Sequence, residues 1–132
     1  MRWRFDPCAL VIALVLLVPL VLLGALGQDW GWVRDRGGDV LVIIWVYWLL
    51  RAVSGAPTWA LAVVAFAVGC AAEAGQALAA AQHWHIANPV LRIALGSVAD
   101  PWDVVSYAIG AGAVLLGSVT VRRIAARRRT AR

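Results

Sequence analysis

Six polar side chains in a mostly apolar chain have the chemistry of one site. Glu73 is the most informative, because helical rise places it inside an apolar segment, roughly 6 Å beyond the segment's midpoint. A carboxyl group at that depth is costly, so it should be neutral or paired, and such residues are functional candidates. Gln76 follows three residues later on the same helical face and can share its partner.

A second polar pair begins the last apolar segment. At 100° per residue, Asp103 and Tyr107 lie on one helical face together with Gly110 and Gly117. The glycines permit another helix to approach closely, so the pair should point into a helix bundle. Asp100 precedes Pro101, a pattern typical of a helix N-terminus, and we interpret it chiefly as a cap.

Topology should bring the two groups together with two further charges, Asp39 and Arg92. An arginine between carboxylates is the natural way to neutralise them. Two interpretations remain open: a salt-bridge network that fixes the bundle, and a ligand or catalytic site. The predicted binding residues are Asp39, Glu73, Gln76, Arg92, Asp103 and Tyr107.

Metal and cofactor chemistry are not predicted. His83 and His85 are two residues apart, so they do not share a helical face, and no Cys or further His completes a ligand set. Cys8 and Cys70 belong to different parts of the chain and predict no disulfide framework. Nucleophile-elbow and phosphate-loop motifs are absent from the sequence.

The elements that must position these residues are membrane helices. In a chain of 132 residues, 63% are hydrophobic and 14% charged, which predicts an all-α integral membrane protein. A span needs about 20 apolar residues. We predict one domain, 1–121, with four transmembrane helices and a short interfacial helix in the last outer loop, begun by Asn88 and Pro89 and ended by Gly96. The four predicted spans are 9–26, 39–53, 57–81 and 102–121.

Two of these spans have alternatives. The first resembles a signal peptide in its basic start and small residues near Gly27, but its apolar run is longer than usual, which favours an uncleaved span. The second is short. It can still cross with local thinning, since Asp39 and Arg51 would lie at opposite interfaces.

Arginine distribution supports four spans. With both termini cytoplasmic, nine arginines lie inside and three, Arg34, Arg36 and Arg92, lie outside, as the positive-inside rule requires of an inner-membrane protein. The tail 122–132 is rich in arginine. Because it follows an apolar helix directly, we expect it to face anionic lipid and expect no nucleic-acid partner.

At these residues the chain resembles the bacterial domain of unknown function 2809 family, which is related in pattern to the VanZ-like family. The matching stretches are Gly38-Asp39 and the segment to Arg51, Glu73-Ala74-Gly75-Gln76, 91–97, and Trp102-Asp103 with Tyr107 and Gly110. The resemblance implies a multi-span membrane protein whose Glu, Gln, Arg and Asp converge. Tyr107 stands where the VanZ-like pattern has Asn.

We therefore expect an uncharacterised membrane protein with an outward-facing polar cluster that binds a lipid headgroup or a lipid-linked precursor of the cell envelope. Arg92 would contact an anionic group and Glu73 would accept a proton. The alternatives are an interfacial enzyme with Glu73 or Asp103 as general base, and a structural or accessory subunit. A homo-oligomer through Gly110 and Gly117 is a further expectation.

Overall fold

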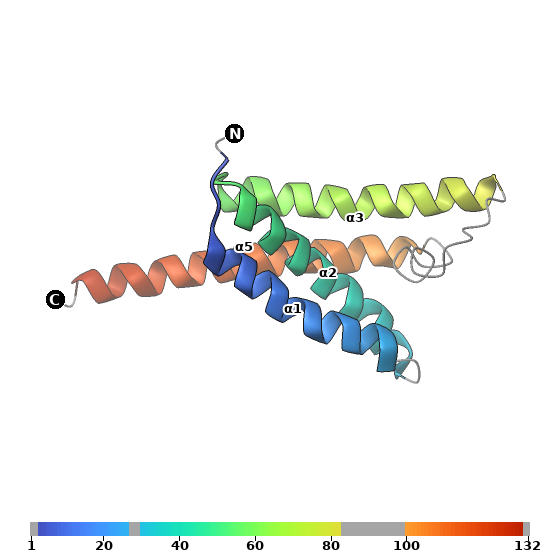
Figure 1. Cartoon of the computed structure of the whole chain (residues 1–132), viewed down its shortest axis with the longest axis horizontal. Coiled ribbons are helices and arrows are strands. Elements are labelled where there is room, and N and C mark those ends of the chain that lie inside the picture. The colour runs from blue at the N-terminus through green and yellow to red at the C-terminus, as the bar shows by residue number, and fades with distance from the viewer. Residues whose placement is uncertain (1–2, 27–29, 83–99, 131–132) are drawn as a thin grey trace.

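The computed structural model describes residues 3–26, 30–82 and 100–130, and within these it is all-helical apart from short connecting segments. The helices are α1 (Pro7–Leu26), α2 (Trp32–Val53), α3 (Thr58–Ala81) and α5 (Pro101–Thr130). Consecutive helices run in alternating directions (Figure 1). As a result, the start of α2, the later part of α3 and the start of α5 lie toward one end of the bundle, while the chain begins at the other.

Local hydrogen bonds define the end of the bundle at which the chain begins. Asp6 caps α1, because its Oδ1 accepts the backbone N–H groups of Cys8 and Ala9 at 3.1 and 3.2 Å. The segment before α1 runs back along the end of α2: the N–H of Asp6 donates to the carbonyl of Ala52 at 2.8 Å, and that of Arg4 to Val53 at 3.3 Å. These bonds satisfy carbonyl groups that the end of a helix would otherwise leave free.

α5 begins with the cap that the sequence predicts. The Oδ1 atom of Asp100 accepts the N–H of Trp102 at 3.0 Å, and Pro101 occupies the first helical position. The helix then continues without a break to Thr130, so most of the arginine-rich tail is a helical extension of α5. Figure 1 shows this extension projecting beyond the other helices.

The core lies where α2, α3 and α5 meet, and it contains Ile43, Tyr47, Leu61, Ala65 and Tyr107. Glycines make the close approach possible. A Cβ atom at Gly110 would come within 2.7 Å of the carbonyl oxygen of Val40, so α5 packs directly against the α2 backbone. Gly69 serves the same purpose on α3, facing Ile43 and Tyr107. Four residues of α3 are spaced by fours: Ala65, Gly69 and Glu73 are buried, whereas Ala77 is exposed.

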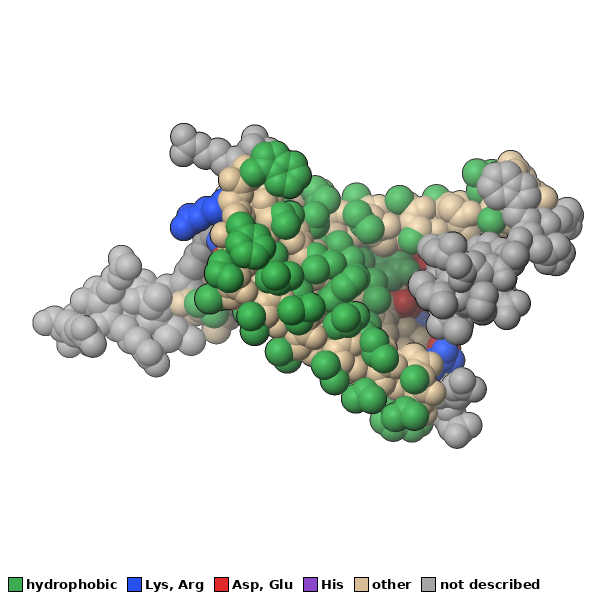
Figure 2. Space-filling model, in the orientation of Figure 1, with side chains coloured by type: hydrophobic (Ala, Val, Ile, Leu, Met, Phe, Trp, Pro, Cys, Tyr) green, Lys and Arg blue, Asp and Glu red, His purple; other side chains and the backbone are tan. Residues whose placement is uncertain are grey.

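Large apolar side chains cover much of the outer surface, as Figure 2 shows over α1. In α1 only Ala9 and Ala13 are buried. Within the described residues, three helical segments are long and apolar enough to cross a membrane: Pro7–Leu26, Thr58–Ala81 and Pro101–Val121. An apolar outside on helices of this length is what a bilayer requires.

α2 differs from the prediction in two ways. It begins at Trp32 rather than at Asp39, which places Arg34 and Arg36 inside the helix instead of in a loop. The second difference is that its charges, Arg36, Asp39 and Arg51 among them, keep α2 out of the set of helices that qualify as membrane spans by composition. The predicted interfacial helix lies outside the described residues.

Candidate functional site

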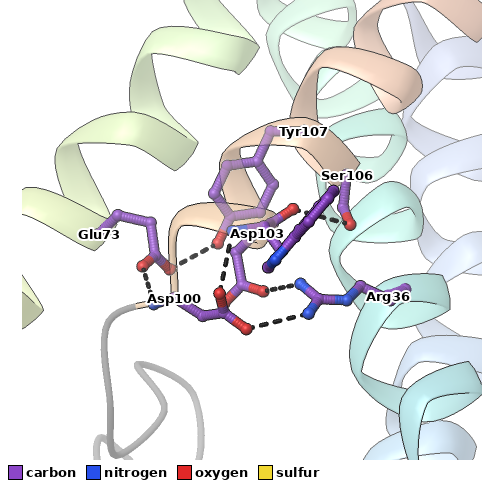
Figure 3. A network of polar contacts seen from close by, with 7 residues as sticks. Arg36, Glu73, Asp100, Asp103, Ser106 and Tyr107 are labelled. Atoms are coloured by element: carbon purple, nitrogen blue, oxygen red, sulfur yellow. Dashed lines mark hydrogen bonds and ion pairs between the residues drawn. The ribbon is translucent and has the colours of Figure 1, made fainter.

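Three helices contribute to one group of polar side chains, which we call the polar cluster (Figure 3). α2 supplies Arg36 and Asp39, α3 supplies Glu73, and α5 supplies Asp103 and Tyr107, with Asp100 immediately before it. The polar cluster lies among apolar helices, and in Figure 2 red and blue side chains show there beside a mostly green face. Its members are Arg36, Asp39, Glu73, Asp100, Asp103 and Tyr107.

Arg36 joins α2 to the start of α5. Its Nη1 donates to Asp103 Oδ1 at 2.9 Å and its Nη2 to Asp100 Oδ2 at 3.0 Å. The guanidinium thus holds two carboxylates, a geometry that uses its fixed fork of N–H groups. Its Cζ also lies 5.9 Å from the centre of the Trp102 ring, within range of a cation–π contact. The Arg36 side chain is 31% exposed, so the cluster remains open to solvent or a ligand.

Glu73 joins α3 to the same start of α5. Its Oε1 accepts the Tyr107 hydroxyl at 3.0 Å, and its Oε2 accepts the backbone N–H of Asp100 at 3.1 Å. Glu73 and Tyr107 are both buried. Within the part of the chain that the structure describes, two hydrogen bonds offset the cost of placing this carboxyl group among apolar helices.

Asp39 completes the polar cluster from α2. Its carboxyl group lies within hydrogen-bonding reach of Asp103 and near both Glu73 and Arg36. Carboxyl groups this close repel when both are ionised, so they are stabilised by a shared proton or by a nearby cation. The described members therefore include four carboxyl groups and one guanidinium, which pairs directly with two of them.

Asp100 is both a helix cap and an ion-pair partner, whereas the sequence predicts chiefly the cap. One oxygen caps α5 and the other pairs with Arg36. The N–H of Trp102, with added help from the Arg36 hydrogen bond and charge, holds the pKa of the Asp100 carboxyl below its usual value of 3.8, although partial desolvation opposes this. The cap and the ion pair therefore favour the ionised form of the same carboxylate.

The structure brings together four of the residues predicted from sequence: Asp39, Glu73, Asp103 and Tyr107. Gln76 is partly exposed, and no hydrogen bond connects it to Glu73 within the described residues. Arg92 lies outside the described residues, as do His83 and His85. Among the residues that the structure describes, no group of His, Cys, Asp or Glu is placed to hold a metal ion.

Arg36 is the cluster member whose pairing the sequence does not predict. The predicted span begins at Asp39, which places Arg36 in an outer loop. A signal was present: Arg36 and Asp39 are three residues apart and share a face once the helix is extended upstream. The segment of α2 from Val40 to Leu50 is strongly apolar, so the charged residues before it are typical of a loop between two helices.

Comparison with known proteins identifies the family. A family model described as "Protein of unknown function (DUF2809)" matches residues 28–111, which include every member of the polar cluster. No curated protein and no solved structure matches the chain. Since the family match covers well over half of the chain, the protein belongs to the domain of unknown function 2809 family, as its sequence motifs suggested.

Proposed function

We propose that the chain is a four-span protein of a bacterial inner membrane, with both termini in the cytoplasm. The length of α2 supports this, because its 22 residues reach about 33 Å, which matches a bilayer core. Its charges are concentrated near its ends, with Arg34, Asp35, Arg36 and Asp39 at one and Arg51 at the other.

Exposed aromatic side chains support the same placement. Trp30, Trp32 and Trp102 lie near the helix ends around the polar cluster, and Trp3, Phe5 and Trp59 lie near the opposite ends. Tryptophan is enriched at both membrane interfaces. A helix bundle that spans a membrane is expected to have two such groups of aromatic side chains, one at each interface, with the apolar part of the helices between them.

In this proposal the polar cluster, at the outer face, binds the polar group of a lipid or of a lipid-linked envelope precursor. One observation carries it: the described cluster contains four carboxyl groups and one guanidinium, and Arg36 pairs with only two of the four, those of Asp100 and Asp103. The complementary ligand is rich in hydrogen-bond donors, such as an ammonium or sugar hydroxyl groups. Arg92 would contact the phosphate of the same headgroup.

Lipid retention tests this proposal. We expect native mass spectrometry of the detergent-purified protein to show bound phosphatidylethanolamine, and Asp39→Asn to weaken its binding about tenfold, the effect of losing one charge-assisted hydrogen bond. Asp35→Asn is the matched control, because it removes the same charge from an exposed position in the first turn of α2. Equal retention by the two variants would rule the headgroup site out.

A structural role is the second candidate, and the contacts of Arg36 favour it. This residue links α2 to α5, while Glu73 links α3 to α5, so the polar cluster ties three helices together. If this is its whole purpose, Asp39→Asn and Glu73→Gln should change stability without changing lipid binding. Turnover of a bound lipid that stops in folded Glu73→Gln would instead indicate the general-base alternative.

A further inference from the structure

A second polar site lies at the opposite end of the bundle from the polar cluster. The chain forms a cavity of about 130 Å³ where the segment before α1 crosses the turn between α2 and α3. This is well above the roughly 10–15 Å³ that one water molecule needs, so there is room for a larger group. The cavity is lined by Arg4, Asp6, Arg51, Ser54 and Gly55.

The two arginines of this cavity have N–H groups to spare. Arg51 donates from Nη1 to the carbonyl of Ala56 at 3.2 Å, which holds the guanidinium in place and leaves its other donors available. The Arg4 side chain is exposed at the rim. Within the described residues neither arginine forms an ion pair with a carboxylate, in contrast to Arg36 at the other end.

The remaining lining groups also favour an anion. Asp6 is the acid of the cavity, but its Oδ1 already accepts two backbone N–H groups of α1, so this carboxylate is engaged in capping. The two arginines and Asp6 leave the lining with an excess of one positive charge. Ser54 is buried, and its Oγ accepts the N–H of Ala56, which leaves the hydroxyl proton as a donor toward the cavity.

The surroundings place this cavity at a membrane interface. Trp3 and Phe5 are 85% and 66% exposed beside it, and Trp59 is exposed just after the turn. Aromatic side chains of this kind lie at the level of lipid headgroups. A positively charged cavity at that level meets phosphate groups before any other anion.

We propose that Arg4, Arg51 and Ser54 bind the phosphate group of an anionic phospholipid in the leaflet opposite the polar cluster. Arg51 supplies a fixed guanidinium, Arg4 closes over the phosphate from the rim, and Ser54 donates from the floor. The site rests on the proposed membrane topology but is independent of headgroup binding at the polar cluster, since it shares no residue with that cluster and has the opposite charge.

The test is a titration of purified protein with phosphatidylglycerol in nanodiscs of phosphatidylcholine, followed by native mass spectrometry. We expect Arg4→Gln and Arg51→Gln each to weaken retention about tenfold, and Ser54→Ala to weaken it by less. Arg123→Gln is the matched control, because it removes the same charge from an exposed position on the extension of α5. General attraction of arginine to an anionic surface predicts equal losses from Arg4 and Arg123, and that result would overturn the proposal.

Two further measurements distinguish loss of lipid binding from loss of folding, and the intact phospholipid from its phosphate group as the ligand. The hydrogen bond that Arg4 forms within the described residues comes from its backbone N–H, so Arg4→Gln should unfold at the wild-type temperature even if Arg51→Gln does not. Soluble glycerol phosphate that displaces the lipid would show that the phosphate group alone is recognised, and failure to displace it would assign the site to the intact phospholipid. If Arg4→Gln retains phosphatidylglycerol at the wild-type level, the proposed site is wrong for either ligand source.

Discussion

The hydroxyl group of Tyr107 donates a hydrogen bond of 3.0 Å to Oε1 of Glu73, and both residues are buried where α5 meets α3. The two residues are 34 positions apart in the chain. This contact brings the most buried carboxyl group among the described residues to the face of α5 that also carries Asp103. The alignment of the polar cluster therefore depends on an aromatic side chain that is itself part of the apolar core.

Removing this hydroxyl should destabilise the bundle. Among the described residues, Tyr107→Phe leaves Glu73 with one hydrogen bond, so we expect the free energy of unfolding to fall by about 0.5–2 kcal/mol, the range for such bonds in membrane proteins. Steric trapping or thermal unfolding in detergent measures the change. Tyr47→Phe is the control, because Tyr47 is equally buried and its hydroxyl forms no hydrogen bond within the described residues. A similar loss in both variants would mean that the Glu73 contact is not responsible.

Arg36 should be strongly coupled to Asp103. Because the pair is partly exposed, Arg36→Gln should cost about 1–3 kcal/mol, between the values for exposed and buried ion pairs. The double variant with Asp103→Asn should lose less than the sum of the single variants. Arg34→Gln removes the same charge two residues away, on another face of α2 where no ion pair forms within the described residues, and should change the unfolding temperature little. Additive losses in the double variant would show that the ion pair does not stabilise the fold.

Acid should weaken the start of α5 through Asp100. The pKa of this carboxyl is lower in the folded protein than its ordinary value of 3.8, so its contribution to stability is present above that value. The contribution is lost as the pH falls through the lower, folded pKa. We expect the unfolding temperature of the wild type to drop more steeply than that of Asp100→Asn between about pH 5 and pH 3. Parallel curves would exclude Asp100 as the group responsible.

Glycine replacements should separate the two glycines predicted to face other helices. Gly110→Ala forces a methyl group against the backbone of α2 at Val40, so it should destabilise the fold by about 1–3 kcal/mol. Gly117 has open space around it within the chain, so Gly117→Ala should be neutral or slightly stabilising through helix propensity. If Gly117 instead mediates an oligomer, its replacement should reduce crosslinking between copies at unchanged monomer stability.

The path of α2 across the membrane can be tested with reporter fusions. A four-span protein with cytoplasmic termini should give external alkaline phosphatase activity when the enzyme is fused after Gly31, and cytoplasmic fluorescence when a fluorescent protein is fused after Gly55. If α2 lies on the surface, both fusions should report the same side. The double variant Arg36→Leu/Asp39→Leu makes the start of α2 more apolar. If α2 already spans the membrane, the two fusions should report the same sides in this variant as in the wild type.

Much of the site was visible in the sequence because polar residues are conspicuous in apolar helices. The depth of Glu73 follows from helical rise, and the shared face of Asp103 and Tyr107 follows from helical periodicity. These are local properties of a chain with one kind of secondary structure. The same reasoning identified the cap at Asp100 and the segments that became α1, α3 and α5.

The packing of α5 against α2 determines that Arg36 is the partner of Asp100 and Asp103. Gly110 lets α5 approach the backbone of α2, and this approach sets which turn of α2 lies beside Asp103. A helix that starts at Trp32 brings Arg36 to that turn, whereas periodicity within α5 carries no information about the register of α2. The sequence by itself determined an apolar helical protein of this family with acidic residues in its helices. The tertiary structure decided which charge they meet, because ion pairing depends on the distance between helices and not on spacing along one of them.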